Sequence, residues 1–453
     1  MPGLLSRRNS GARAGDVTPA APAYLRLAPG LERVKSLVGH RFGPILELRR
    51  QRLGGPQPPW WLCTGRLSRY PIGSLYNESP PTSAGTSLDI DEATARAVGE
   101  ALERYSGLNV VLEHIEASLE EGGFAGRWPV CAPDELCPSS YRLPPHNTPL
   151  THVRAERLSN AAGVVVPASF VCLAFRPEPP ELPITLPIST GLAFHTQLHR
   201  AIWNGFCEVV ERDAVMSMWW IHRSVPEIDL ATAPNDVCIR VDLLNDHGIT
   251  PHLYDITTEL EFPTVFCILE AKLYPNIVVS AATRASAAAS CSRALDEAVS
   301  MRVALLARAL ESDLQKKATQ IQIAEKPVTL HDHARWYADG DRDGAFDFLL
   351  HSDKEVMPYQ RYKERSIPEP ADMTSLRGLA HRLEADNVSV LWTDVTVPEV
   401  SDIGFAVRVI VPELVPMSMP DDIRWLGTER LLRRASVSIP TKSAFTRHPH
   451  PFA

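Results

Sequence analysis

Apolar residues recur every three to four positions in three long stretches of the chain, a spacing that predicts helices. These stretches cover residues 91–105, 197–219 and 290–310. Shorter apolar or alternating runs predict strands, and they lie at residues 164–166, 170–175, 265–269, 277–280 and 406–411. Helices interspersed with strands indicate an α/β (α+β) fold of mixed β-sheets.

Prolines and the chain ends suggest how these elements are organised. The 39 prolines cluster in predicted loops at residues 56–59, 133–149 and 177–187. Residues 1–22 are rich in Ala, Gly, Ser, Pro and Arg without an apolar stretch, which is typical of a disordered tail and not of a signal peptide. We therefore expect a disordered tail (1–22), an N-terminal extension (23–80) and a main domain (81–453) with a proline-rich tail (448–453).

Composition and charge narrow the range of partners. Hydrophobic residues make up 44% of the 453 positions, enough for a large packed core. The net charge is −8, and no basic run is interleaved with aromatic residues, which argues against a nucleic-acid partner. No segment approaches the roughly 20 uncharged apolar residues that span a bilayer. We expect a soluble, cytoplasmic protein with no membrane partner.

The cysteines point to buried thiols and not to a metal site. No C-x-x-C pair is present, and the spacing of Cys131 and Cys137 is not that of a zinc knuckle. Cys172, Cys238 and Cys267 lie in apolar runs that we expect to be strands. Free buried thiols are the favoured interpretation.

One charged motif occurs twice. Residues 100–104 and 208–212 both read E-x-x-E-R, and each copy follows a run of small residues, at 83–87 and 189–193. An alanine stands seven positions before the first Glu of each copy, at Ala93 and Ala201. Because the surroundings repeat as well as the motif, segments 81–108 and 189–220 are predicted to be halves of an internal pseudo-repeat.

Two interpretations of these acidic helices remain open. Asp89 can cap the first helix, with Glu92 completing a capping box. An apolar stripe from Ala95 to Tyr105 would then leave Glu100 and Glu103 on the other side with small residues. In a single helix this is the solvated face of a surface helix. Two such copies favour carboxylates that share a hard cation such as Mg²⁺.

A third segment adds another carboxylate to this prediction. Residues 293–297 (R-A-L-D-E) echo residues 96–100 (R-A-V-G-E). Three acidic helices that bring Glu side chains to one place would form a cage too negative to be stable empty, and such a cage calls for a divalent metal. An arginine one residue after each E-x-x-E pair can neutralise a carboxylate or contact a phosphate.

In this order and spacing, the three segments resemble the YcaO family. Its first motif is matched by Gly85, Ala93, Ala97 and the 100–104 segment, and its third by residues 294–302. Its second motif is matched from Gly191 to Ala214. The resemblance covers the chain from about Ser83 to its end, and it implies a YcaO-type fold with acidic helices around a Mg-ATP site.

Further segments resemble the branch of that family that modifies ribosomally made peptides. They are residues 254–258 (Y-D-I-T-T), 211–220 ending in W-W, 404–412, and the C-terminal H-P-H-P-F-A. The chain departs from the family pattern at six positions. These are Thr86, Ser87, Arg96, Thr190, Ser300 and Ala453.

The resemblance implies an ATP-dependent cyclodehydratase that forms thiazoline or oxazoline rings from Cys, Ser or Thr of a precursor peptide. The glutamates implied to hold Mg²⁺ are Glu100, Glu103, Glu208, Glu211 and Glu297. Gly85, Arg104, Arg212 and Arg302 are implied to contact the nucleotide. Pro449, Pro451 and the Ala453 carboxylate are implied to act in catalysis near the γ-phosphate.

Partners and alternatives follow from the same resemblance. Residues 23–80 are too few for a ThiF-like domain, so we expect a separate leader-peptide-binding or ThiF-like partner protein, and a homodimer remains an open alternative. Within the family, a thioamide-forming or amidine-forming reaction is the alternative. A non-catalytic scaffold subunit that binds peptide or nucleotide is an interpretation from another class.

Overall fold

The computed structural model describes most of the chain from residue 32 onward. The described residues are 32–39, 43–68, 82–118, 148–179, 181, 184–185, 188–316, 327, 329–351, 355–418, 424–438 and 444–452. The expected tail at 1–22, Cys131, Cys137 and Ala453 lie outside them.

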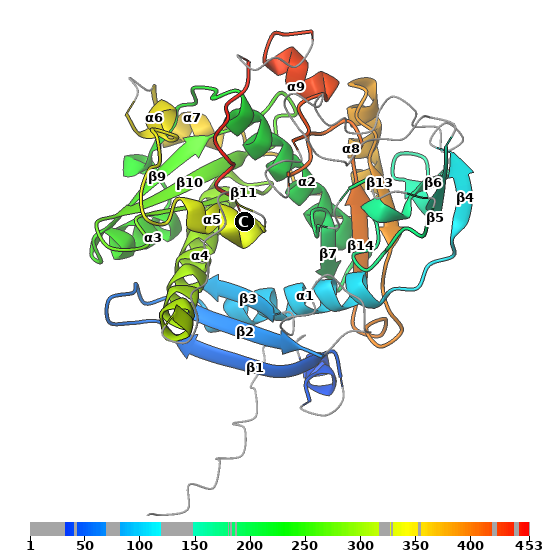
Figure 1. The fold of residues 1–453 in the computed structure, drawn as a ribbon, viewed down its shortest axis with the longest axis horizontal. Helices are drawn as coiled ribbons and strands as arrows, with labels where there is room; N and C mark the ends of the chain where they lie inside the picture. Colours follow the sequence, from blue (N-terminus) through cyan, green and yellow to red (C-terminus); the bar gives the residue numbers. More distant parts are fainter. Residues whose placement is uncertain are drawn as a thin grey trace, which may run out of the picture.

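The described strands form three sheets (Figure 1). The first sheet is antiparallel and contains β1 (Ile45–Arg52), β2 (Trp61–Leu67) and β3 (Thr82–Ser87) in this order. The second has the order β11 (Ile277–Thr283), β10 (Thr264–Ala271), β9 (Ile249–Asp255), β8 (Glu227–Asp229) and β12 (Val356–Pro358). The third has the order β4 (Ile115–Ser118), β5 (Pro149–Arg157), β13 (Leu391–Asp394), β14 (Phe405–Ile410) and β7 (Leu192–His195), and β6 (Gly163–Pro167) also pairs with β5.

Helices lie against these sheets and between them (Figure 1). The α-helices are α1 (Ile90–Asn109), α2 (Leu198–Trp220), α3 (Asn235–Asn245), α4 (Ala287–Lys316), α5 (Leu330–Trp336), α6 (Asp347–Leu350), α7 (Tyr359–Lys363), α8 (Met373–Ala385) and α9 (Glu429–Arg434). Short 3₁₀ helices are η1 (Glu32–Leu37), η2 (Ala168–Phe170) and η3 (Leu230–Thr232). Helix α1 packs on β3 and β2, α2 on β14 and β7, and α4 on β11 and β10. No described helix is long and apolar enough to cross a membrane.

The mixed fold confirms the predicted class, and each of the three long helices forms where it was expected. Four of the five predicted strands form as well, as β6, β10, β11 and β14. The strand predicted at 170–175 is wrong. Helix η2 and a turn stand there instead, and the N–H groups of Val171 and Cys172 both donate to the Ala168 carbonyl at 3.0 and 2.9 Å. Val171, Cys172 and Leu173 are all buried, and a short apolar run of this kind does not specify a strand by periodicity.

Glycines let two of the sheets approach their helices closely. A Cβ on Gly85 would overlap the Ala93 carbonyl oxygen and lie 2.6 Å from the Ala97 nitrogen. A Cβ on Gly205 would lie 2.7 Å from the Gly191 carbonyl oxygen, and Gly191 has φ = +83°, a conformation that favours glycine. The small residues of both motif copies therefore bring a strand onto the helix that carries the carboxylates.

The described cysteines are free, as predicted, and all but Cys238 are buried. Burial raises the pKa of the Cys63 and Cys172 thiols to about 11, which makes them poor nucleophiles. Cys238 was expected to lie in a strand, and this prediction is wrong because Cys238 lies in α3. The expected boundary at residue 81 falls between β2 and β3, which are neighbours in one sheet.

Candidate functional site

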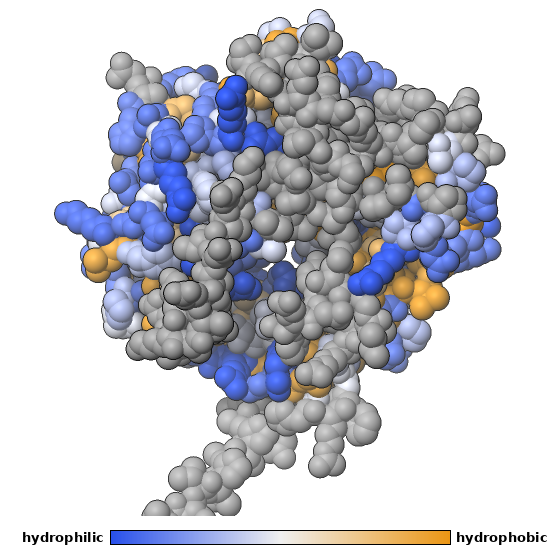
Figure 2. Space-filling view, viewed as in Figure 1, coloured by the Kyte–Doolittle hydropathy of each residue, from blue (hydrophilic) through white to orange (hydrophobic). Residues whose placement is uncertain are grey.

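The five predicted glutamates line one cavity of about 920 Å³. Glu100 and Glu103 come from α1, Glu208 and Glu211 from α2, and Glu297 from α4. These three helices surround the centre of the molecule in Figure 1. The space-filling view in the same orientation is hollowed there, and hydrophilic residues are visible in the hollow (Figure 2).

Helix α1 positions its carboxylates through its cap and through β3. The Asp89 side chain caps the helix by accepting from the N–H groups of Asp91 and Glu92, both at 2.8 Å. The Ala84 N–H donates to one Glu100 oxygen at 2.7 Å, and Arg104 pairs with the other at 2.6 Å. Strand β3 and Arg104 thus fix the Glu100 carboxylate from two sides.

Helix α2 repeats this arrangement in the second half. The Gly191 N–H donates to one Glu208 oxygen at 3.0 Å, and Arg212 pairs with the other at 3.1 Å. Arg212 also pairs with Glu211, whose second oxygen accepts from the Thr283 N–H at 3.1 Å. The same contacts in both halves, from a backbone amide in or just before a strand and from an arginine four residues on, support the predicted pseudo-repeat.

Helix α4 contributes its carboxylate with the charges in the reverse order. Arg293 precedes Glu297 by one turn, and its Nε lies 2.6 Å from Glu297 Oε1. The third wall therefore supplies one carboxylate to the cavity, and its arginine precedes that carboxylate in the chain.

Burial and mutual repulsion in the shared cavity disfavour the ionised forms of these carboxylates. Burial, followed by the charges of Glu208 and Glu100, raises the pKa of Glu103 well above its ordinary value. Burial raises the pKa of Glu208, and burial followed by the charge of Glu297 raises that of Glu211 to about 7 although Arg212 opposes it. Oxygen ligands held this close favour a divalent cation, so the residues present fit Mg²⁺.

A buried aspartate organises the adjoining wall of the cavity. Asp296 is inaccessible to solvent and accepts hydrogen bonds from Trp60 Nε1 at 2.7 Å, Arg96 at 2.7 Å and Arg240 Nε at 2.9 Å. Arg96 also donates to the Thr86 carbonyl, and the Thr86 hydroxyl donates to the Asp296 carbonyl at 2.7 Å. Two departures from the family pattern, Thr86 and Arg96, therefore join β3, α1 and α4.

Sequence reasoning missed the partner of this network. Arg240 lies in α3, pairs with Asp236 and lines the cavity beside Arg96. The motif spacing contained no signal for it, because α3 lies outside the three acidic segments. Only the buried Asp296, next to Glu297 in the third segment, indicates that a cation is needed nearby.

The C-terminal tail reaches the cavity wall through Phe452. The Arg212 guanidinium lies 4.4 Å from the centre of the Phe452 ring. The Pro449 carbonyl accepts from the Tyr337 hydroxyl at 2.7 Å, and His450 stacks on His333 with ring centres 3.8 Å apart. Pro451 is buried. The His450 carbonyl accepts from Nδ1 of His333 in α5 at 2.7 Å, so this part of the tail lies beside α5 (Figure 1).

Two predicted nucleotide contacts do not line the cavity. Gly85 faces α1, where Ala93 and Ala97 leave no room for a side chain. Arg302 is buried and donates to the Pro275 carbonyl at 2.7 Å and to Gln57 at 3.3 Å. Their positions give Gly85 a packing role and Arg302 a bracing role, and they do not support direct contact with a nucleotide.

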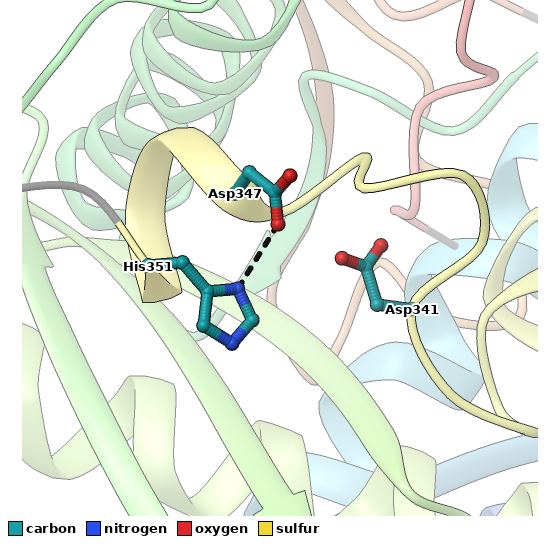
Figure 3. Close-up of side chains that lie close together, drawn as sticks. All are labelled: Asp341, Asp347 and His351. Atoms are coloured by element: carbon teal, nitrogen blue, oxygen red, sulfur yellow. Dashed lines mark hydrogen bonds and ion pairs between the residues drawn. The ribbon is translucent and has the colours of Figure 1, made fainter.

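A second acidic cluster lies at the surface and does not join the cavity lining. Asp341, Asp347 and His351 lie close together, and all three are exposed (Figure 3). His351 Nδ1 lies 3.0 Å from Asp347, one helical turn before it, and Asp341 accepts from the Phe346 N–H at 3.2 Å. These contacts explain the cluster as a helix pair and a turn.

Comparisons with known proteins identify a matching family and solved structures with a similar fold. Residues 84–415 match the family described as YcaO cyclodehydratase, ATP- and Mg²⁺-binding. An uncharacterized protein of Methanothermobacter thermautotrophicus is 26% identical over 365 residues, which cover 79% of this chain and 85% of that protein.

Two solved structures share the fold. A heterocyclase in complex with substrate and cofactor has a TM-score of 0.73 at 18% identity, over 93% of this chain and 57% of that one. YcaO from Methanopyrus kandleri bound with AMPPCP and Mg²⁺ has a TM-score of 0.61 at 18% identity, over 86% and 91% of the two chains. The chain therefore spans little more than half the length of the heterocyclase.

Proposed function

The chain belongs to the YcaO family, whose members bind ATP and Mg²⁺, and we propose that it is an ATP-dependent cyclodehydratase of peptide backbone amides. The observation that carries the proposal is the convergence of five glutamates from α1, α2 and α4 on one cavity. A scaffold subunit without catalysis would have no need to keep carboxylates in a position that raises their pKa.

The proposed substrate is a Cys, Ser or Thr residue of a ribosomally made precursor peptide. Its side chain loses its proton and adds to the preceding carbonyl carbon, which closes the ring, and the new oxyanion accepts the γ-phosphoryl group. Phosphate then leaves with the former amide oxygen, the amide nitrogen loses its proton, and a C=N bond forms to complete the azoline. Overall, the peptide loses one water, and ADP and phosphate form. An amide oxygen is a very poor leaving group, so phosphorylation makes its loss feasible.

The residues of the cavity divide this work. Glu100, Glu103, Glu208, Glu211 and Glu297 would hold Mg²⁺, which neutralises charge on the phosphates when bound. Arg104 and Arg212 orient the first glutamate of each pair, and Arg212 can also meet a phosphate. The contact of Phe452 with Arg212 of the cavity lining supports a role for the tail, in which Pro449 and Pro451 place the Ala453 carboxylate where it can position the substrate or move its proton.

A separate partner that binds the leader peptide is part of the proposal. The heterocyclase that shares the fold is a longer chain, of which this one covers 57%. Such a partner protein would supply affinity for the leader peptide. The homodimer remains an alternative assembly, and mass photometry with and without peptide distinguishes the two.

One assay tests the function. The protein is incubated with ATP, Mg²⁺ and a candidate peptide, with and without sulfide, and the product is weighed. Loss of one water is expected for a ring and would also arise from an amidine, which fragmentation of the product distinguishes. A mass gain equal to replacing oxygen by sulfur would instead show a thioamide. If no phosphate is released in any condition with the partner protein present, the proposal that this protein is an ATP-dependent enzyme is refuted.

A further inference from the structure

The charged side chains of the cavity are arranged almost entirely in pairs. The described lining contains seven carboxylates and six arginines. Five of the arginines each lie within ion-pair distance of a carboxylate of the same lining. The pairs are Arg96 with Glu92, Arg104 with Glu100, Arg212 with Glu208 and Glu211, Arg240 with Asp236, and Arg293 with Glu297.

One cation and one anion are left over. The Arg284 guanidinium donates to the Thr283 carbonyl at 2.7 Å and has no carboxylate partner among the described residues. Glu103 likewise forms no ion pair within the described part of the chain, although Arg104 follows it. The two residues do not pair with each other. Among the described lining residues, the cavity therefore has one arginine and one carboxylate that form no ion pair.

The two unpaired groups stand on different walls. Glu103 lies on α1 near Glu100, and the negative charges of Glu208 and Glu100 both act on its carboxyl group. Arg284 lies between β11 and α4, next to Thr283, whose N–H donates to Glu211. An occupant that complements both must offer a cation toward α1 and an anion toward the start of α4. A metal ion bound to a phosphate has this polarity.

We propose that Arg284 binds the terminal phosphate of the nucleotide, an inference that rests on the proposed ATP-dependent function. Glu211, beside Arg284, also contacts Arg212, which stacks on Phe452 of the tail. A phosphoryl group that moves from nucleotide to peptide must lie between the metal carboxylates and this tail. A planar guanidinium can donate two parallel hydrogen bonds to such a phosphate.

Nucleotide binding tests this assignment without any peptide. The variants are Arg284→Met, which removes the charge, and Arg284→Lys, which keeps it but loses the planar fork. Arg200→Met is the matched control. Arg200 lies in α2, but it is exposed, pairs with Glu369 at 3.8 Å and does not line the cavity. Affinities for β,γ-methylene-ATP and for ADP are measured by calorimetry in the presence of Mg²⁺.

Arg284→Met is expected to weaken the methylene-ATP complex by about tenfold or more, the effect of losing a charge-assisted hydrogen bond. Its ADP affinity is expected to stay within about twofold of wild type on the same ground. Arg284→Lys should lie between, and Arg200→Met should bind both nucleotides like wild type. Equal losses for the two nucleotides, or none, would overturn the assignment.

Turnover gives a second readout. The kcat of Arg284→Met should fall by about 100-fold, as when a donor to developing charge is removed. A raised KM for peptide with unchanged methylene-ATP affinity would place Arg284 on the peptide and contradict the proposal. If the wild-type protein binds methylene-ATP but releases no phosphate with any peptide, only the proposed reaction fails and the binding result for Arg284 stands.

Discussion

The two copies of the E-x-x-E-R motif have the same local geometry but different surroundings. In α1 the side chains of Glu100 and Arg104 are 30% and 36% exposed. In α2 the equivalent side chains of Glu208 and Arg212 are 26% and 13% exposed, and Glu211 is 6% exposed. Helix α1 packs between the first and third sheets, whereas α2 packs between the second and third sheets and ends in the fully buried Trp219 and Trp220.

The difference shows that a repeated motif can fix the geometry of its contacts without fixing how strong those electrostatic contacts are. In both copies a backbone amide in or just before a strand, and an arginine one turn later, hold the first glutamate. Screening by solvent weakens the α1 interactions, while burial strengthens those of α2 and makes an unpaired charge there more costly. We therefore expect equivalent substitutions to have larger effects in α2 than in α1.

The largest effect is expected from the carboxylates. Glu208→Gln and Glu211→Gln should each abolish ATP turnover, because they remove a metal ligand from the buried wall. Glu100→Gln should also reduce turnover severely, but with more residual activity than Glu211→Gln, because water can more readily replace a ligand that is 30% exposed than one that is 6% exposed. Phosphate release at saturating Mg²⁺ measures all three, and Glu113→Gln, an exposed pair with Arg154, is the control.

Ordinary turnover in Glu208→Gln or Glu211→Gln would refute the carboxylate cage. Unfolding must be separated from loss of ligand. Because the folded pKa of Glu211 is raised to about 7, its ionised form lowers stability above pH 7. Metal-free Glu211→Gln should therefore unfold at pH 8 at a temperature no lower than wild type.

The next largest effect separates the two arginines. Arg212→Lys loses contacts to Glu208 and Glu211 and the stacking on Phe452, whereas Arg104→Lys loses a partly exposed pair. We expect kcat to fall by about 10-fold to 100-fold for Arg212→Lys, the range for one or two lost charge-assisted contacts, and by less than about threefold for Arg104→Lys, as for a surface pair. Equal effects in the two variants would contradict the comparison.

Much of the site was predictable because it is local. Helix periodicity placed α1, α2 and α4, and the spacing of Glu100, Glu208 and Glu297 within them identified the cavity walls. Small residues before each helix indicated close packing, which Gly85 and Gly205 show. These features depend on residues within one or two turns of each other, so a single sequence contains them.

What the sequence did not indicate depends on long-range contacts. The pairing of Arg96 and Arg240 through Asp296 joins three helices, and no spacing rule connects them. The unpaired state of Arg284 follows only from knowing which five arginines are paired. The apolar run at 170–175 was misread because burial by neighbours, and not alternation, makes it apolar.

A smaller effect tests whether the tail supports α2. Phe452→Ala removes the ring beneath Arg212 and should reduce kcat by about fivefold to tenfold, since a partly buried cation–π contact contributes roughly 1 to 1.4 kcal/mol. Phe452→Trp keeps an aromatic face and should retain more activity. ADP affinity serves as the control measurement, and a matching loss there would show general damage to the cavity instead.

The smallest effect concerns pH and the histidine that anchors the tail. His450 is buried, and its Nε2 lies 2.7 Å from the Ser418 carbonyl oxygen. Its ring packs against those of His333 and Trp220, and the positive charge of Arg424 also disfavours its protonation. Burial and then His333 hold the pKa of His450 well below its ordinary value of 6.5. Between these two pKa values the unfolded chain binds a proton that the folded protein excludes. The stability contributed by neutral His450 is therefore present above about pH 6.5 and is lost as the pH falls below it.

The stability lost below pH 6.5 should disappear in His450→Gln, whose amide can still donate to Ser418 but does not titrate. Thermal unfolding from pH 8 to pH 5 should thus give a steeper fall for wild type than for His450→Gln, whatever their difference at pH 8. Substituting the exposed His351 in the same way controls for general acid effects. If the unfolding temperatures of wild type and His450→Gln fall equally with pH, titration of His450 does not destabilise the fold, and the tail does not depend on a neutral His450.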